Sequence, residues 1–329
     1  MRREAERLFS GDGEKPETER FLGALLDPPP FAPCVLWTGS EEEKAAFLET
    51  FSPAPGDASL PWLPEFALRL APGSEPGGDP LHSAGAFYSL DFSSVWAASA
   101  LLAATVPARP RVLDLCAAPG GKSVFASLAL RPGFLLSNEV IGKRLAILRH
   151  NLRRCRVANA FTQRLDPRDL QTLAGDQFDT VIVDAPCSGQ SLLAKGIENP
   201  GAFHPSSVKG NAKRQTGILT AAAECVAPGG WMLYSTCTFA ERENERVVSR
   251  ILERRPDFSA VAVNHLGPWQ SRHVDFPAYR LYPHDGLGAG AFSCLLRREG
   301  ERGTETELPP DLLAYPASGA DSSPADPVQ

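Results

Sequence analysis

Two kinds of hydrophobic pattern alternate along the chain from about Phe87 onward. Short apolar runs of the kind that form buried strands occupy residues 111–115, 133–140, 159–165, 178–186, 230–238, 258–263 and 291–297. Helix-type periodicity lies between them, in the segment after Gly121 and over residues 93–106, 141–155, 211–226 and 242–254. The alternation predicts an α/β fold: a Rossmann-like, doubly wound, mostly parallel sheet that binds ligands at the carboxyl ends of its strands.

The segment 141–155 shows the clearest amphipathic spacing. Its apolar residues recur every three or four positions, at Ile141, Leu145, Leu148, Leu152 and Cys155. The remaining positions are rich in basic residues, and the stretch contains no acid; a second basic group comprises Lys209, Lys213 and Arg214. Basic helix faces of this kind either bind phosphate groups or are simply solvated, and the pattern leaves both interpretations open.

Composition divides the chain into three expected units. Residues 1–80 hold twelve of the thirty prolines, which is typical of a small, loop-rich accessory region. Residues 81–298 carry the alternating strands and helices. Residues 299–329 hold seven acidic residues against Arg302 alone, so this tail accounts for the formal net charge of −6 and the rest is neutral. Because the tail is polar and lacks periodicity, we expect it to be disordered.

Other features of the composition narrow the class of protein. The longest apolar run, residues 95–106, is shorter than the roughly 18 residues that a bilayer span requires. The first twenty residues are rich in acids and lack an apolar signal core, so we expect a cytoplasmic protein with no membrane partner. Seven irregularly spaced cysteines favour reduced thiols over a disulfide framework. We further expect a monomer without a metal site.

The segment VLDLCAAPGGKS, residues 112–123, joins a predicted strand to a predicted helix. It ends like a phosphate-binding loop, but Cys116 stands where that loop needs Gly, and Pro119 lacks a backbone N–H. A tight turn here also suits S-adenosylmethionine, with Glu139 at the end of the next strand for the ribose and Asp166 at the end of the third for the adenine. We favour the methyl donor over a nucleotide hydrolase, although TVIVDAP would also suit a Mg²⁺-binding strand.

Six motifs follow one another over residues 85–297: GAFYSLDFSS, DLCAAPGGKS, SNEV, DAPCSG, YSTCTF followed by ENE, and RLYPHDGLGAGAF. In this series the chain resembles the RNA 5-methylcytosine methyltransferases, which include bacterial 16S rRNA enzymes and eukaryotic Sun-type relatives. The resemblance implies a Rossmann-like, S-adenosylmethionine-dependent methyltransferase fold over residues 81–298. The residues that we expect to bind the cofactor are Cys116, Ala117, Ala118, Pro119, Gly120, Gly121, Lys122, Glu139, Arg144, Asp166 and Asp184.

Methylation of cytosine at C5 explains why two cysteines matter. A thiolate that adds to C6 makes C5 nucleophilic, and a carboxyl group beside N3 assists the addition. Asp184 is our candidate for that carboxyl group. A Pro-Cys dipeptide, as in DNA-type enzymes, would favour Cys187 as the nucleophile, but the resemblance of YSTCTF implies that Cys237 attacks and that Cys187 assists release.

The expected partner is RNA, with rRNA as the first substrate and tRNA as the second. The segment APCVLWTGSEEE, residues 32–43, is shorter and more acidic than the RNA-binding segment of many family members, which leaves open whether residues 1–80 dock the RNA. Basic residues near the two cysteines would hold its backbone instead: Lys195, Lys209, Lys213 and Arg214. A catalytically silent RNA-binding assembly factor with the same fold is the alternative.

Overall fold

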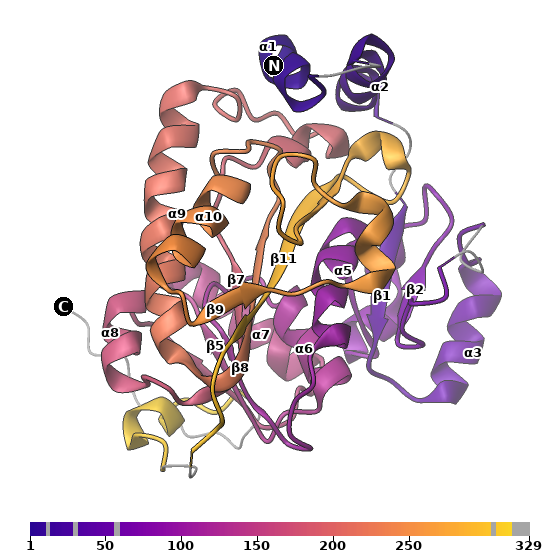
Figure 1. Cartoon of the computed structure of the whole chain (residues 1–329). Coiled ribbons are helices and arrows are strands. Elements are labelled where there is room, and N and C mark those ends of the chain that lie inside the picture. The colour runs from indigo at the N-terminus through magenta and orange to yellow at the C-terminus, as the bar shows by residue number, and fades with distance from the viewer. Residues whose placement is uncertain (11–13, 29–31, 56–59, 304–306, 318–329) are drawn as a thin grey trace.

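The computed structural model describes residues 1–10, 14–28, 32–55, 60–303 and 307–317. Its centre is an eight-stranded sheet with the order β10-β11-β8-β7-β4-β5-β6, with β9 paired to β11 (Figure 1). The parallel strands are β4 (Arg111–Asp114), β5 (Phe134–Asn138), β6 (Ala160–Gln163), β7 (Phe178–Asp184) and β8 (Val226–Thr236). The antiparallel strands are β9 (Phe258–Ala260), β10 (Tyr279–Leu281) and β11 (Ala291–Arg298). The expected doubly wound α/β fold is confirmed.

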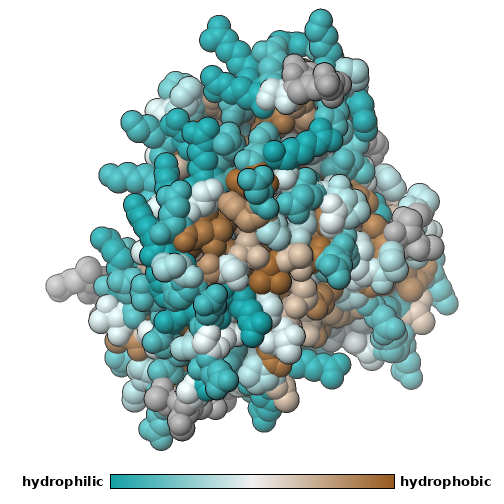
Figure 2. Space-filling view, viewed as in Figure 1, coloured by the Kyte–Doolittle hydropathy of each residue, from teal (hydrophilic) through white to brown (hydrophobic). Residues whose placement is uncertain are grey.

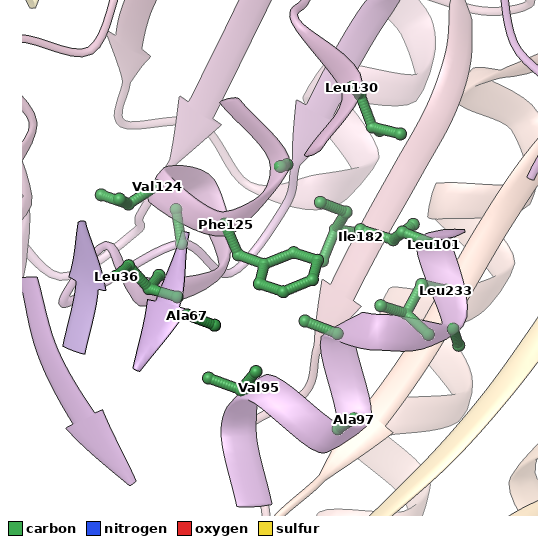
Figure 3. Close-up of a cluster of buried hydrophobic side chains, with 14 of the residues drawn as sticks. Leu36, Ala67, Val95, Ala97, Leu101, Val124, Phe125, Leu130, Ile182 and Leu233 are labelled. Atoms are coloured by element: carbon green, nitrogen blue, oxygen red, sulfur yellow. The ribbon is translucent and has the colours of Figure 1, made fainter. Parts of the chain in front are cut away.

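Helices cover both faces of this sheet because successive strand residues point to opposite sides. Ile182 and Leu233 pack on one side, in a cluster with the helices α5 (Phe92–Ala98), α6 (Gly121–Leu130) and α7 (Gly142–Arg154). Figure 3 shows Phe125 of α6 at the centre of that cluster, between Ile182, Val95 and Leu101. The neighbouring strand residues pack on the other side with α8 (Pro167–Leu173), α9 (Pro205–Cys225) and α10 (Glu245–Arg254).

Three helices differ from the expected ones by more than one residue at a boundary; the smallest difference is at α10, which starts at Glu245 instead of residue 242. The helix expected over residues 93–106 is α-helical only to Ala98 and continues as a 3₁₀ helix, η3 (Ser99–Ala103). The helix expected from residue 211 begins at Pro205, because the His204 side chain accepts a hydrogen bond from Ser206 N and proline suits the first helical turn. The other short helices are α4 (Pro80–Ala84), η2 (Pro76–Gly78), η4 (Gln190–Lys195), η5 (Asn264–Trp269) and η6 (Pro283–Asp285).

The N-terminal region forms a second, three-stranded sheet that extends beyond residue 80. Its antiparallel strands β1 (Pro33–Trp37), β2 (Ala67–Arg69) and β3 (Phe87–Asp91) have the order β2-β1-β3. The helices of this region are α1 (Arg2–Leu8), α2 (Glu14–Leu26) and α3 (Glu41–Thr50). Because β3 pairs with β1 along its whole length, the expected boundary after residue 80 cuts through this sheet. Leu36 and Ala67 also share a hydrophobic cluster with Val95 of the main unit.

Part of the acidic tail is ordered, contrary to the expectation that residues 299–329 are disordered. Ala317 N donates to Ala160 O at 2.7 Å, and Thr162 N donates to Tyr315 O at 2.8 Å, so the tail pairs with the exposed edge of β6. A 3₁₀ helix, η7 (Pro310–Leu313), buries Leu312 completely. The hydrogen bonds with the edge of β6 and the burial of Leu312 stabilise this part of the tail despite its polar composition. Residues 304–306 and 318–329 lie outside the described residues.

Across the described parts of the chain, no helix combines the length and the apolar character that crossing a membrane would require.

Candidate active site

The carboxyl ends of the parallel strands bring the expected site residues to one edge of the sheet. The loop after β4 leads into α6, Glu139 follows β5, and Asp166 follows β6. Asp184 ends β7, and Cys237 directly follows β8. Because these strands run in parallel, residues that are distant in sequence become neighbours at this edge.

The loop between β4 and α6, residues 115–120, is held against two neighbouring strands. Leu115 N donates to Ile182 O and Ala117 N to Asn138 O, each at 2.9 Å. Gly120 adopts a φ of 121°, a conformation that disfavours residues with a Cβ, and α6 starts at the next residue. The loop is therefore a fixed turn that presents its backbone at the carboxyl edge of the sheet.

Asp114, which sequence reasoning missed, is completely buried beneath this loop. Its Oδ2 atom accepts a hydrogen bond from the Ser123 hydroxyl at 2.7 Å, and Ser123 also contacts Ser137 at 2.9 Å. Its Oδ1 atom is buried without a hydrogen-bond partner among the described atoms. Burial raises the pKa of Asp114 to about 7, against a lowering by the Ser123 hydrogen bond. The free acceptor marks a place where a bound group could supply a donor.

Arg144 links Glu139 to the loop between β4 and α6. The carboxylate of Glu139 is buried, accepts from Ile141 N at 2.9 Å, and lies 3.2 Å from an Arg144 nitrogen. Another Arg144 nitrogen donates to Ala118 O at 2.6 Å. Glu139, Arg144 and the loop thus form one connected wall.

Asp166 lies further out than the other acidic residues of the site. It is the N-cap of α8, accepting from Arg168 N at 3.0 Å, and its carboxylate pairs with the Arg168 side chain. These hydrogen bonds lower the pKa of Asp166. Asn138 connects this strand end to β5, because its side chain hydrogen-bonds both Leu165 O and Leu165 N. In the described residues, no direct contact links Asp166 with Glu139 or Asp184.

Asp184 and Lys122 form an ion pair that joins the end of β7 to the first turn of α6. The Lys122 ammonium lies 2.7 Å from Asp184 Oδ2, and the Ser235 hydroxyl donates to Asp184 Oδ1 at 3.0 Å. The Lys122 side chain is only 9% exposed, whereas that of Asp184 is 39% exposed. The carboxyl group is therefore held in place by a buried cation while it stays accessible to a ligand.

Cys187 and Cys237 meet across the ends of β7 and β8, with their sulfur atoms 3.1 Å apart. Their hydrogen bond acts on the two thiols in opposite directions: it lowers the pKa of Cys237 and, together with burial, raises that of Cys187 well above its usual value. The charges of Lys122 and Lys195 lower the pKa of Cys237 further, against burial and the charge of Asp184. Cys237 is also the exposed member of the pair. The pair is therefore asymmetric, with the thiolate favoured at Cys237.

Glu243 joins the two loops that carry these cysteines, a role that the sequence did not reveal. Its Oε2 atom accepts from Ser188 N and from the Gln215 side chain, each at 2.9 Å. The hydroxyl groups of Ser188 and Thr238 lie 2.7 Å apart. Each cysteine is thus followed by a residue of this network. The motif ENE, which contains Glu243, was the only sequence signal for it.

The other five cysteines do not take part in this pair. Cys34, Cys155, Cys225 and Cys294 are buried. Burial raises the pKa of Cys116, so this thiol of the loop is kept protonated. Within the ranges that the structure covers, no group of three or more His, Cys, Asp or Glu side chains is arranged to hold a metal ion.

Sequence comparison places these features in one family. The family described as 16S rRNA methyltransferase RsmB/F matches residues 102–297, which is more than half of the chain. The ribosomal RNA small subunit methyltransferase F of Serratia proteamaculans is 35% identical over 212 residues, covering 63% of this chain and 44% of that protein. The protein of the same name from Aeromonas salmonicida is 30% identical over 276 residues, covering 82% and 58% respectively. The chain thus spans about half the length of the curated relatives it matches.

Solved structures show the same fold. A methyltransferase homologue from Pyrococcus horikoshii superposes with a TM-score of 0.70 at 24% identity, over 87% of this chain and 92% of that one. NSun6 from Pyrococcus horikoshii, solved with SFG, gives a TM-score of 0.70 at 19% identity, over 91% and 98%. These structural similarities show the Rossmann-like fold, and the family model shows to which family the chain belongs. The chain belongs to the RsmB/F family of 16S rRNA methyltransferases.

Proposed function

We propose that this protein is an S-adenosylmethionine-dependent methyltransferase that acts on C5 of a cytosine in RNA, with 16S rRNA as its substrate. The observation that carries the proposal is the pair Cys187–Cys237, whose sulfur atoms lie 3.1 Å apart and whose pKa values shift in opposite directions. The names of the matched relatives support the RNA substrate.

The wall formed by the loop, Glu139 and Arg144 suits the cofactor. Glu139 offers a fixed, buried carboxylate for ribose hydroxyls, and Arg144 holds it against the loop. The unpartnered acceptor of Asp114 would be satisfied by a donor that arrives with the cofactor, such as its amino group. Asp166 remains our candidate for the adenine. The NSun6 structure with SFG, an analogue of S-adenosylmethionine, supports a site of this kind in the fold.

Cys237 is the proposed nucleophile. C5 of cytosine reacts poorly until a thiolate has added to C6 and the electron pair of the C5=C6 bond has become available at C5. Cys237 meets this requirement because its sulfur is exposed and its pKa is lowered, chiefly by the hydrogen bond with Cys187. S-adenosylmethionine, when bound, supplies the electrophilic methyl group that C5 attacks.

Asp184 is the proposed partner of the base at N3. Addition of the thiolate at C6 drives negative charge toward N3 and O2, so a hydrogen bond that Asp184 donates to N3 in its acid form lowers the barrier. The Lys122 ammonium and the Ser235 hydroxyl fix the two oxygens of Asp184, at 2.7 and 3.0 Å. Lys122 also places a positive charge next to the developing negative charge.

Cys187 is the proposed release group. After methyl transfer, a solvent water molecule takes the proton from C5, the electron pair of the C5–H bond re-forms the C5=C6 bond, and the bond between C6 and the Cys237 sulfur breaks with its electron pair on sulfur. The raised pKa of Cys187 keeps its thiol protonated, 3.1 Å from the departing sulfur, where it donates a hydrogen bond that stabilises the new thiolate. The two cysteines thus have different tasks because their surroundings set different charge states.

The test is to express Cys187→Ala in host cells, denature the lysate and sequence any RNA that stays attached to the protein. We expect the adduct through Cys237 to accumulate, so that the recovered RNA identifies both substrate and position. The matched control, Cys187→Ala/Cys237→Ala, should retain no RNA. An adduct that persists in this control would refute the role of Cys237. If Cys187→Ala forms no adduct while the wild-type protein methylates RNA, Cys187 does not act in release.

A further inference from the structure

A basic groove runs along the face of the sheet that carries α8, α9 and α10. The groove has a volume of about 770 Å³, and α9 packs against both of the other helices. Seven cationic side chains line it, all of them exposed: Arg168, Lys209, Lys213, Arg242, Arg246, Arg250 and Arg254. None of the described residues that line it is acidic. Figure 2 shows a mainly hydrophilic surface over this flank of the molecule, at the left of the view.

The floor of the groove consists of small residues of α9. Ala212, Thr216, Gly217 and Thr220 line the groove together with the cations. The hydroxyls of Thr216 and Thr220 donate to backbone oxygens of their own helix, so they do not fill the space. A ligand in the groove would therefore meet cations and little steric obstruction.

Helix stability does not explain the charges of α10. Arg246, Arg250 and Arg254 follow each other at intervals of four residues, which places like charges side by side on one helix face. Arg246 also lies in the first turn, where the helix dipole disfavours a cation. Only Arg254 is in the last turn, where the dipole favours one.

Carboxylates neutralise only two of the seven cations. Arg168 pairs with Asp166 and Arg246 with Glu241. For the other five, the structure records no ion pair with a described carboxylate: Lys209, Lys213, Arg242, Arg250 and Arg254. A solvated helix face normally intersperses cations with acids, so this surface carries charge that a partner can neutralise.

The groove shares two chain segments with the candidate active site. Arg242 follows Cys237 by five residues, and Arg168 follows Asp166 by two. From Arg246 to Arg254, α10 extends away over about 12 Å, given a rise of 1.5 Å per residue. Cations spaced over such a length suit a chain of phosphates better than a single small anion.

We propose that this groove binds the phosphate backbone of the RNA next to the target cytosine and thereby orients the base toward Cys237. The inference rests on the proposed function, since it assumes that RNA is the substrate. Lys209 and Lys213 were already expected to contact RNA. The structure places the arginine residues of α10 in the same groove, a connection that the sequence did not reveal. The contacts involve backbone charge, so they supply affinity and position rather than sequence recognition.

The test compares two variants with the same loss of charge on opposite faces of the sheet. Arg250→Gln/Arg254→Gln removes two cations of the groove, and Lys143→Gln/Arg153→Gln removes two exposed cations of α7. The probe is a fluorescein-labelled single-stranded RNA of mixed sequence, titrated by anisotropy at several salt concentrations. We expect the slope of log K against log salt to become shallower by about 1.4 for the groove variant, at 0.7 per lost phosphate contact, and to stay unchanged for the α7 variant.

Two further measurements separate the possible failures. Stabilisation by S-adenosylmethionine in a melting experiment should be equal in all three proteins, which shows that the variants are folded with an intact cofactor site. If the wild-type protein methylates RNA and both variants bind the probe with the wild-type slope, the groove proposal fails and the proposed function stands. An equal decrease of this slope in both variants also refutes the proposal that the groove binds the RNA. If the wild-type protein binds no RNA, both proposals fail.

Discussion

At Cys237, the charge state of one sulfur atom decides whether the proposed chemistry can start. The hydrogen bond with Cys187 lowers the pKa of Cys237, so its thiolate persists to lower pH than that of an ordinary cysteine. Cys187→Ala removes this hydrogen bond, so the pKa should rise and alkylation of Cys237 by iodoacetamide should need higher pH. Mass spectrometry of the Cys237 peptide over a pH series measures the midpoint. An unchanged midpoint would mean that Cys187 does not control this thiol.

Lys122 should act on Cys237 in the same direction. Its ammonium lowers the pKa of the thiol through space and pairs with Asp184 at 2.7 Å. We expect Lys122→Met to shift the alkylation midpoint to higher pH and to reduce single-turnover methylation by about 10²-fold or more, since it removes a charge beside the developing negative charge. Lys143→Met, on the exposed face of α7, is the matched control and should change neither quantity.

At this scale, the sequence indicated the candidate side chains but not their partners. Cys187, Cys237 and Asp184 could be selected because they follow apolar strands within recognisable motifs. The pairing of Lys122 with Asp184 depends on which strands are neighbours, and the burial of Asp114 depends on the packing of α6 over β4. Neither depends on local sequence, so neither could be predicted from it. The proposed roles of the site residues stay predictions until they are tested.

At the scale of elements, α10 links the core to the cysteine loops. Glu243 lies just before this helix and accepts hydrogen bonds from Ser188 N and Gln215. Glu243→Ala should lower the free energy of unfolding by about 1–3 kcal/mol, because it leaves a buried N–H without an acceptor. It should also lower kcat more than it changes affinity for S-adenosylmethionine, because the two sulfur atoms lose their fixed separation.

Thermal unfolding and single-turnover methylation measure these effects. Glu253→Ala, an exposed change on the same helix, is the control and should alter stability by no more than about 0.5 kcal/mol. If Glu243→Ala lost stability but kept wild-type kcat, the network would support the fold without positioning the cysteines.

The elements themselves were largely predictable because strand and helix periodicities are local. The parallel direction of β4 to β8 follows from the alternation of strands and helices, whereas their order in the sheet was not predicted. The earlier start of α9 could not be read from apolar spacing, because its first two turns are polar and depend on the cap at His204. The pairing of β1 with β3 escaped prediction because proline-rich loops separate these strands, so their contact is not local.

At the scale of the whole molecule, segments near both ends of the chain pack against the central α/β unit. Phe21 of α2 packs edge to face on Phe239, two residues after Cys237, with ring centroids 5.0 Å apart. The N-terminal helices therefore support the loop of the proposed nucleophile from the side opposite the sheet. Composition alone suggested a separate accessory unit, because aromatic contacts between distant segments leave no periodic signal.

The acidic tail provides the last prediction. Residues 307–317 pair with the edge of β6 and bury Leu312 completely, while Tyr315 stacks under the Arg149 guanidinium at 5.1 Å. A chain that ends at Gly303 should therefore lose about 1–3 kcal/mol of stability: burial of a leucine contributes about 1.5–3 kcal/mol and two backbone hydrogen bonds about 1 kcal/mol each, offset by the entropy of ordering the segment. A chain that ends at Ala317 retains every one of these contacts and should match the 329-residue chain in urea unfolding. Equal stability of all three chains would show that the segment docks without stabilising the fold, and its acidic residues would then serve only to keep this edge of the sheet from pairing with other chains.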